Sequence, residues 1–197
     1  MAKDENPRQK FIDMAYKLFS QRGFYGVSLN DVAKEIGVSK QAIIYHFRTK
    51  EALYAAVLGK MAGHFDEVVG RVRAQEGTGV ARLEAVLGAL HRHMQDCPED
   101  ARLIMRELLD NPDRAKTSQK WFLRGFLDDM VEVMRETPLY AGQSDDAVAS
   151  AAYQAIGAIN YFAISDATLV GVWGEGRLAG MKDSFLAALV AREGRDS

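Results

Sequence analysis

The short segment at residues 39–46 carries side chains suited to contact with a nucleic acid. Gln41 presents an amide that can form two hydrogen bonds with an adenine edge, and Ala42 and Ile44 offer apolar surface for a thymine methyl group. Lys40 supplies a positive charge for phosphate oxygens. The segment therefore has the composition of a surface that reads double-stranded DNA.

Groups that could bind phosphate flank this segment. Backbone amides at a helix N-terminus attract anions, and Ser28, Ser39 and Thr49 are all residue types that cap such an end. The other polar side chains of the segment, with the lysine that follows it, can also reach phosphates. The candidate DNA-binding residues are Ser28, Ser39, Lys40, Gln41, Ala42, Ile44, Tyr45, His46 and Lys50.

The charge of the chain is distributed unevenly. The net charge is −2, yet residues 1–60 hold 10 Lys and Arg against 6 Asp and Glu, whereas residues 61–197 hold 15 against 21. A basic N-terminal region favours a polyanionic partner. A basic excess of this size is also typical of an ordinary solvated surface, so the charge alone does not decide between the two.

Two short helices must hold the candidate reading segment in place. The first follows Ser28 and ends at Gly37, and the second follows Ser39. This spacing predicts a helix-turn-helix, in which the first helix braces the second and the second lies in the major groove. Small Ala33 permits close approach of the two helices. The side chains expected to face inward are Ile36, Val38, Ile43 and Phe47.

The alternative is a tight helix pair inside an all-α core with no role in DNA binding. Ile44 lies on the outward face beside Tyr45 and His46, and an exposed isoleucine is costly without a partner. The basic excess lies in the same region. Both observations favour DNA binding over the core alternative.

Apolar spacing and helix-terminating residues predict an all-α chain of about nine helices. No alternating run is long enough for a sheet, and each of the four prolines lies where helical periodicity starts or stops. Beyond the helix that runs from Thr49 to about Gln75, helices are expected near 80–97, 99–111, 116–136, 143–171 and 175–193, with a loop at 171–176. We expect a helix-turn-helix domain at residues 1–52 and a second helical domain at 53–197.

Residues from about 10 to about 58 resemble the N-terminal domain of TetR-type transcriptional regulators. The resemblance is carried by Phe19, the Gly23-Phe24-Tyr25-Gly26 run, Val32-Ala33, Ile36-Gly37-Val38-Ser39, Tyr45-His46-Phe47 and Thr49-Lys50-Glu51-Ala52-Leu53. It implies a homodimeric cytoplasmic repressor that binds a pseudo-palindromic DNA operator and is released by an unknown small molecule. Gln41, Ala42 and Ile44 stand where the family commonly has glycine, threonine and tyrosine, which alters the operator-reading face.

The C-terminal helices are the expected homodimer interface, because the resemblance places dimerisation there. Helices 143–171 and 175–193 would pair with their copies. Residues 147–163 are rich in alanine and glycine, which permit close helix approach, and Leu178, Phe185 and Leu189 belong to an apolar stripe on the last helix. The alternative is that both helices are internal core.

Methionine and aromatic side chains of the C-terminal region could line an adaptable apolar cavity. Any single member of this set has core packing as its simpler interpretation, and His64, His91, Asn160 and Asp166 are possible polar anchors. The candidate ligand-binding residues are Met61, His64, Phe65, Met94, Met105, Trp121, Phe122, Phe126 and Tyr161.

Other classes of function receive little support from the sequence. His91 and His93 are two residues apart on a helix and so point to different faces, which predicts no metal pair, and no catalytic or cofactor motif is found. The single Cys97, the polar N-terminus and the lack of an 18-residue apolar run favour a reducing compartment without membrane insertion. The competing hypothesis is an all-α small-molecule binder or enzyme that does not bind DNA.

Overall fold

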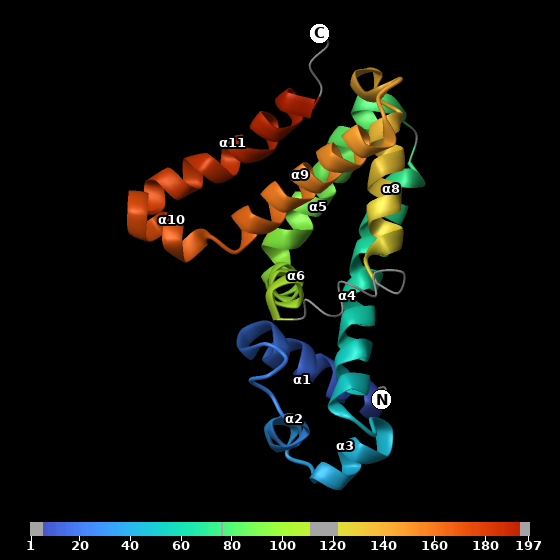
Figure 1. The fold of residues 1–197 in the computed structure, drawn as a ribbon. Helices are drawn as coiled ribbons and strands as arrows, with labels where there is room; N and C mark the ends of the chain where they lie inside the picture. The colour runs from blue at the N-terminus through green and yellow to red at the C-terminus, as the bar shows by residue number, and fades with distance from the viewer. Residues whose placement is uncertain (1–5, 76, 111–121, 194–197) are drawn as a thin grey trace, which may run out of the picture. The chain divides into compact units, whose positions relative to one another are not determined.

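The computed structural model describes residues 6–75, 77–110 and 122–193, which form ten α-helices and one 3₁₀ helix, with no strand among them (Figure 1). The predicted all-α class is therefore confirmed. The chain divides into two compact units, one from residues 1–63 and 102–122 and one from residues 64–101 and 123–197. Two helices, α4 (Lys50–Arg73) and α6 (Pro98–Asp110), contribute residues to both units.

The first unit contains α1 (Pro7–Arg22), α2 (Leu29–Ile36) and α3 (Lys40–His46), together with the start of α4 (Figure 1). The Asn6 side chain accepts a hydrogen bond from the Arg8 amide and so caps α1. The interior is aromatic, because the Tyr54 ring centroid lies 4.9 Å from those of both Phe19 and Phe24. This cluster ties α1 and the loop after it to α4.

The later part of α6 completes the core of the first unit. The Tyr54 hydroxyl donates a 2.8 Å hydrogen bond to Oε2 of Glu107. Arg106 donates from Nε to the carbonyl oxygen of Ser20 at 3.0 Å and from Nη2 to that of Gln21 at 2.5 Å. These carbonyls belong to the last turn of α1, where backbone acceptors lack partners within the helix, so Arg106 satisfies them.

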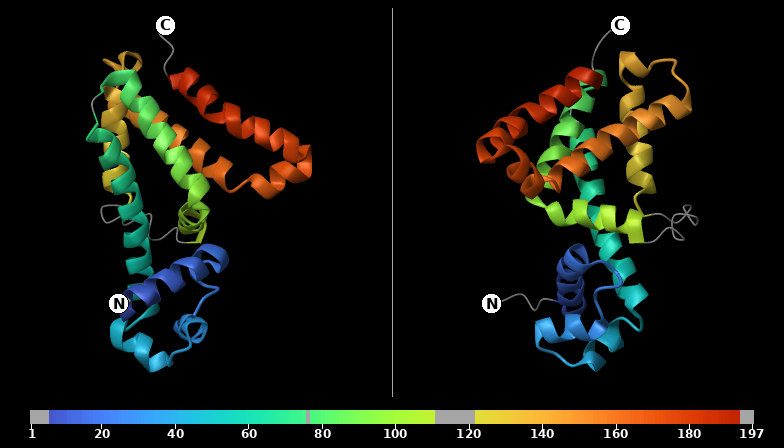
Figure 2. Two further views of the ribbon diagram at one scale, coloured as in Figure 1. Left: turned by 180° about the vertical axis from the view of Figure 1, so that it is seen from behind. Right: turned by 60° about the vertical axis from the view of Figure 1, so that its left-hand side comes forward.

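The second unit contains the rest of α4 with α5 (Gly79–Asp96), α8 (Arg124–Arg135), the 3₁₀ helix η2 (Pro138–Tyr140), α9 (Asp145–Ala163), α10 (Asp166–Trp173) and α11 (Glu175–Glu193). Helices α5, α8 and α9 pack against one another, and α10 turns the chain so that α11 returns to contact α5 (Figure 2). Arg73 pairs with Asp129 and Glu132 and so links α4 to α8. The buried apolar core includes Leu83, Val86, Leu87, Leu90, Met130, Val133, Met134, Ala155 and Ile159.

The single helix predicted over 143–171 is wrong, because the chain bends by 69° between α9 and α10. At the bend the Ser165 hydroxyl donates to the Tyr161 carbonyl oxygen at 2.6 Å, a local bond that competes with regular helix geometry. The Asp166 carboxylate accepts a 2.6 Å bond from Lys182 Nζ, which ties the start of α10 to α11. Within the described ranges no single helix has the length and apolar composition to cross a membrane, although the bent α9–α10 pair meets that test jointly.

Two further predictions need correction. The helix expected over 116–136 is helical only from Arg124 to Arg135 in the described residues; Phe122 and Leu123 form a turn, and residues 116–121 lie outside the described ranges. The loop expected at 171–176 is also wrong, because Gly174 alone separates α10 from α11. Its φ of 81° is favourable for glycine only, so one residue suffices to end α10.

Candidate DNA-reading surface and effector cavity

A capping box fixes the start of α2. The Asp31 amide donates to the Ser28 hydroxyl oxygen at 3.2 Å, while the Ser28 amide and hydroxyl both donate to Asp31 Oδ2 at 2.7 Å. These bonds from Ser28 outweigh the small effect of burial and lower the pKa of Asp31. The Ser28 amide and hydroxyl therefore donate within the capping box, and contact of this helix end with a phosphate stays a prediction.

The turn between α2 and α3 depends on Gly37. Its backbone is left-handed, with φ 77° and ψ 30°, and its amide donates to the Lys34 carbonyl oxygen at 3.1 Å. The Val38 amide donates to the Ala33 carbonyl oxygen at 3.0 Å, which completes a pattern typical of helix ends. Ser39 then caps α3 by accepting a 3.3 Å bond from the Ala42 amide. The turn therefore sets the direction in which α3 leaves α2.

One face of α3 is anchored and the opposite face is exposed. Ile43 is fully buried, and Phe47, which follows the helix, is buried as well. Ile44 and Tyr45 are 39% and 84% exposed. The predicted inward position of Val38 is wrong, because it is exposed in the turn. The α2 positions that are fully buried are Val32 and Ala33, while Ile36 at the last turn of α2 is only half-buried.

The candidate DNA-binding residues fall into an exposed group and a packed group. The exposed ones are Ser28, Ser39, Lys40, Gln41, Ile44 and Tyr45. Ala42, His46 and Lys50 are half-buried. The His46 ring lies 5.4 Å from that of Phe11, and the Lys50 ammonium lies 4.2 Å from the centroid of Phe24. Burial lowers the pKa of Lys50.

One cation beside this surface was not singled out from the sequence. The Arg8 guanidinium lies 4.9 Å from the centroid of the Phe47 ring, at the end of α3. Arg8 follows Asn6 and Pro7 at the start of α1, about 40 positions earlier in the chain. The positive charge was visible in the sequence, but its stacking on Phe47 follows only from the tertiary packing.

The second unit contains a cavity of about 360 Å³ along α4 and α5. Its charged and polar walls include Arg71, Arg92 and Asp96. The complete lining is Val68, Arg71, Val72, Gln75, Ala85, Ala89, Arg92, His93 and Asp96. The cavity therefore offers two guanidinium groups, a carboxylate and an imidazole among small apolar side chains.

The predicted ligand-binding residues are absent from this lining. Met61, Phe65, Met94 and Phe126 are buried in the core, His64, Met105 and Phe122 are half-buried, Tyr161 is exposed, and Trp121 lies outside the described residues. Met61, Met105 and Phe122 belong to the first unit and the other described members to the second. Contact of these residues with a ligand stays a prediction.

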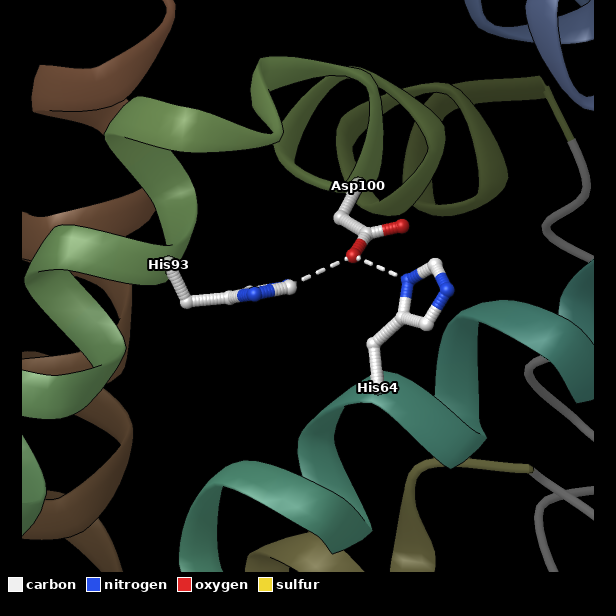
Figure 3. Close-up of side chains that lie close together, drawn as sticks. All are labelled: His64, His93 and Asp100. Atoms are coloured by element: carbon white, nitrogen blue, oxygen red, sulfur yellow. Dashed lines mark hydrogen bonds and ion pairs between the residues drawn. The ribbon is translucent and has the colours of Figure 1, made fainter.

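The two histidines of α5 face different surroundings. The His91 ring stacks on Phe185, with 5.0 Å between centroids, and burial lowers its pKa. His93 instead approaches His64 and Asp100, and the rings from α5 and α4 point toward the carboxylate on α6 (Figure 3). The prediction that His91 and His93 do not pair is consistent with these positions, but the cluster around Asp100 was not visible in the local spacing.

Comparison with known proteins identifies the family that residues 11–57 resemble. Residues 11–57 match the family described as "Bacterial regulatory proteins, tetR family". The first unit therefore carries a TetR-family domain. This TetR-family domain contains α2, α3 and the turn between them, which are the elements that present the candidate reading face.

Similarity to curated relatives covers only part of the chain. The biofilm operon negative transcriptional regulator IcaR of Staphylococcus aureus strain Newman is 40% identical over 47 residues, which are 24% of this chain and 25% of that protein. The regulator AcrR of Shigella flexneri is 28% identical over 106 residues, or 53% of this chain and 48% of that protein. The chain thus spans between a quarter and a half of the curated relatives it matches.

Structural similarity extends beyond the TetR-family domain. The transcriptional regulator FadR of Bacillus subtilis, solved in complex with stearoyl-CoA, superposes with a TM-score of 0.70 at 19% identity. The match covers 93% of this chain and 97% of that one. At this identity the likeness establishes a shared fold over the matched part of the chain.

Proposed function

We propose that this protein is a ligand-responsive, dimeric transcriptional repressor that binds a pseudo-palindromic operator through α3. The observation that carries the proposal is the division of α3 into a buried anchor at Ile43 and an exposed row at Lys40, Gln41 and Ile44. The TetR-family match over the same residues and the negative regulator IcaR among the relatives support repression. The protein would act in the cytoplasm and have no enzymatic activity.

The exposed side chains of α3 divide into two roles. Gln41 is the candidate for reading an adenine edge, and Ile44 is the candidate for contact with a thymine methyl group. Lys40 and Tyr45 would position the helix through phosphate contacts. Arg8 adds a cation at the end of α3, where its stacking on Phe47 holds it near the surface. Base reading therefore rests on two residues and positioning on several.

A second copy of this chain is the proposed partner of the C-terminal helices. Large apolar side chains are exposed on α9 and α10, namely Tyr153, Tyr161, Val172 and Trp173. An exposed group of this kind is typical of a protein interface. A dimer would place two α3 helices in major grooves about 34–36 Å apart, or a multiple of that distance. A sedimentation mass equal to the 21.8 kDa chain at micromolar concentration would exclude this dimer.

The proposed effector is a small molecule with an anionic group. Arg71 and Arg92 both line the cavity along α4 and α5, and two guanidinium groups suit a phosphate or carboxylate. FadR of Bacillus subtilis, which has the same fold, was solved with stearoyl-CoA, a ligand that carries phosphates. Ligand and operator must weaken each other's binding by the same factor if this cavity controls DNA release.

The test of DNA binding uses fluorescence anisotropy with duplexes from the region upstream of the gene. Lys40→Ala should weaken binding to every duplex and reduce the slope of affinity against salt by about one phosphate contact. Gln41→Ala should instead reduce discrimination at one base pair by about 1–3 kcal/mol.

Lys17→Ala provides the matched control for the DNA experiment. Lys17 is exposed on α1, so this variant loses the same charge away from α3. It should bind the operator with nearly unchanged affinity and salt slope. If Lys40→Ala and Gln41→Ala both bind the operator as the wild type does, the assignment of α3 as the reading helix is wrong.

A further inference from the structure

Three side chains from three helices of the second unit meet at one point. Oδ2 of Asp100 lies 2.8 Å from Nδ1 of His64 and 2.7 Å from Nε2 of His93 (Figure 3). One ligand atom from each of the three lies within 4.8 Å of the other two. His64 comes from α4, His93 from α5 and Asp100 from the first turn of α6. The cluster thus joins three helices at a single carboxylate.

The burial of this cluster sets it apart from an ordinary surface ion pair. The Asp100 side chain has no solvent exposure, and both histidines are half-buried. A buried carboxylate is costly unless cations or hydrogen bonds compensate for the loss of water. The His93 ring is also held edge-on to Phe65, with 5.5 Å between centroids. The three side chains are therefore held by packing and hydrogen bonds instead of extending into solvent.

We propose that His64, His93 and Asp100 bind one divalent transition-metal ion. Two imidazoles and one carboxylate form the donor set that zinc and related ions take from proteins, and three protein ligands leave at least one position open. Metal bonds of about 2.0–2.2 Å place neighbouring ligand atoms roughly 3.4 Å apart in a tetrahedral site. The two distances from the Asp100 oxygen to the imidazole nitrogens need to lengthen by only about 0.6–0.7 Å for the ion to replace the present hydrogen bonds.

The cluster shares one residue with the cavity along α4 and α5. His93 is at once a ligand and part of the cavity lining. An ion held by the three side chains would therefore be bound in part by a residue that also lines the cavity proposed for the effector. This inference adds a metal to the second unit and does not depend on whether α3 binds DNA.

The test measures metal binding by the untagged full-length chain after treatment with a chelator. Zn²⁺ is titrated in competition with a chromogenic chelator, and Co²⁺ is added separately so that its visible absorption reports coordination. The wild type should bind one ion per chain, and Co²⁺ should develop the absorption bands of a site with nitrogen and oxygen ligands. His64→Gln and Asp100→Asn should each lower Zn²⁺ affinity at least about tenfold and remove these bands.

His91→Gln is the matched control because it removes an imidazole from the same helix, two positions from His93. It should bind Zn²⁺ as the wild type does. Circular dichroism checks that each variant folds, and the half-buried His64 serves for the test if the change at buried Asp100 prevents folding. Binding of less than one ion per chain by the wild type, or equal binding by a folded His64→Gln variant, would overturn the proposal. Operator binding is measured separately, so either proposal can fail without the other.

Discussion

Ile43 and Ile44 are neighbours on α3 with the same side chain and opposite surroundings, so replacing each by alanine separates folding from recognition. Ile43 is fully buried, and truncating a buried isoleucine to alanine costs about 2–5 kcal/mol through lost apolar contact and the cavity left behind. Ile44 is 39% exposed, so much of its side chain already contacts water. We expect Ile44→Ala to cost less than about 1 kcal/mol.

The assay is urea unfolding followed by circular dichroism, with all three proteins at one concentration because the proposed dimer would add a concentration-dependent contribution to stability. The slope of the unfolding free energy against urea should stay unchanged, so that the midpoint reports stability directly. Ile43→Ala should move the midpoint to clearly lower urea, and Ile44→Ala should scarcely move it.

The effect of Ile44→Ala on operator affinity should be larger than its effect on stability. Ile44→Ala removes apolar surface from the proposed base-reading face, so it should weaken operator binding while the protein stays folded. Its loss should be greatest on duplexes with thymine at the contacted position. Equal losses of unfolding free energy in the two variants would refute the anchoring role of Ile43, and unchanged operator affinity in Ile44→Ala would refute the outward role of Ile44.

Two further predictions concern pH and backbone conformation. Burial lowers the pKa of His91 below its usual 6.5, so the unfolded chain binds a proton at this ring more readily than the folded chain does. The stability contribution of the neutral ring is therefore fully present above pH 6.5 and is lost as the pH falls below that value. In urea midpoints measured from pH 7.5 to 5.5, His91→Gln should show a smaller decline than the wild type. Gly37→Ala should destabilise the fold by about 1 kcal/mol because the φ of Gly37 is 77°. Gly59→Ala should instead stabilise it by roughly 0.5–1 kcal/mol, because Gly59 lies within α4 and the added methyl group meets open space. Melting temperatures of the two variants that shift in the same direction would contradict this pair of predictions.

The helix-turn-helix was predictable because its signals are local. The caps at Ser28 and Ser39 and the glycine stop at Gly37 each act within a few residues, and the structure shows all three in these places. The exposure of α3 followed from the same reasoning, since an anchor at Ile43 leaves the opposite face outward.

The features that were missed depend on how segments pack rather than on local spacing. The bend after α9 involves the Asp166–Lys182 bond, whose partners are 16 residues apart in the chain. The exposure of Val38 is set by how the turn packs, which its apolar character does not reveal. The group around Asp100 draws its histidines from positions 36 and 7 residues away, so no local spacing indicates it.

The contribution of α6 to the first unit has a consequence for biosynthesis. The bonds from Glu107 and Arg106 to Tyr54 and the end of α1 join segments separated by 53 to 86 residues. A nascent chain that has emerged only to residue 63 therefore lacks part of the packing around α1. The N-terminal segment reaches its final form only after about 110 residues have left the ribosome, and excision at residue 63 would yield a weakened fragment.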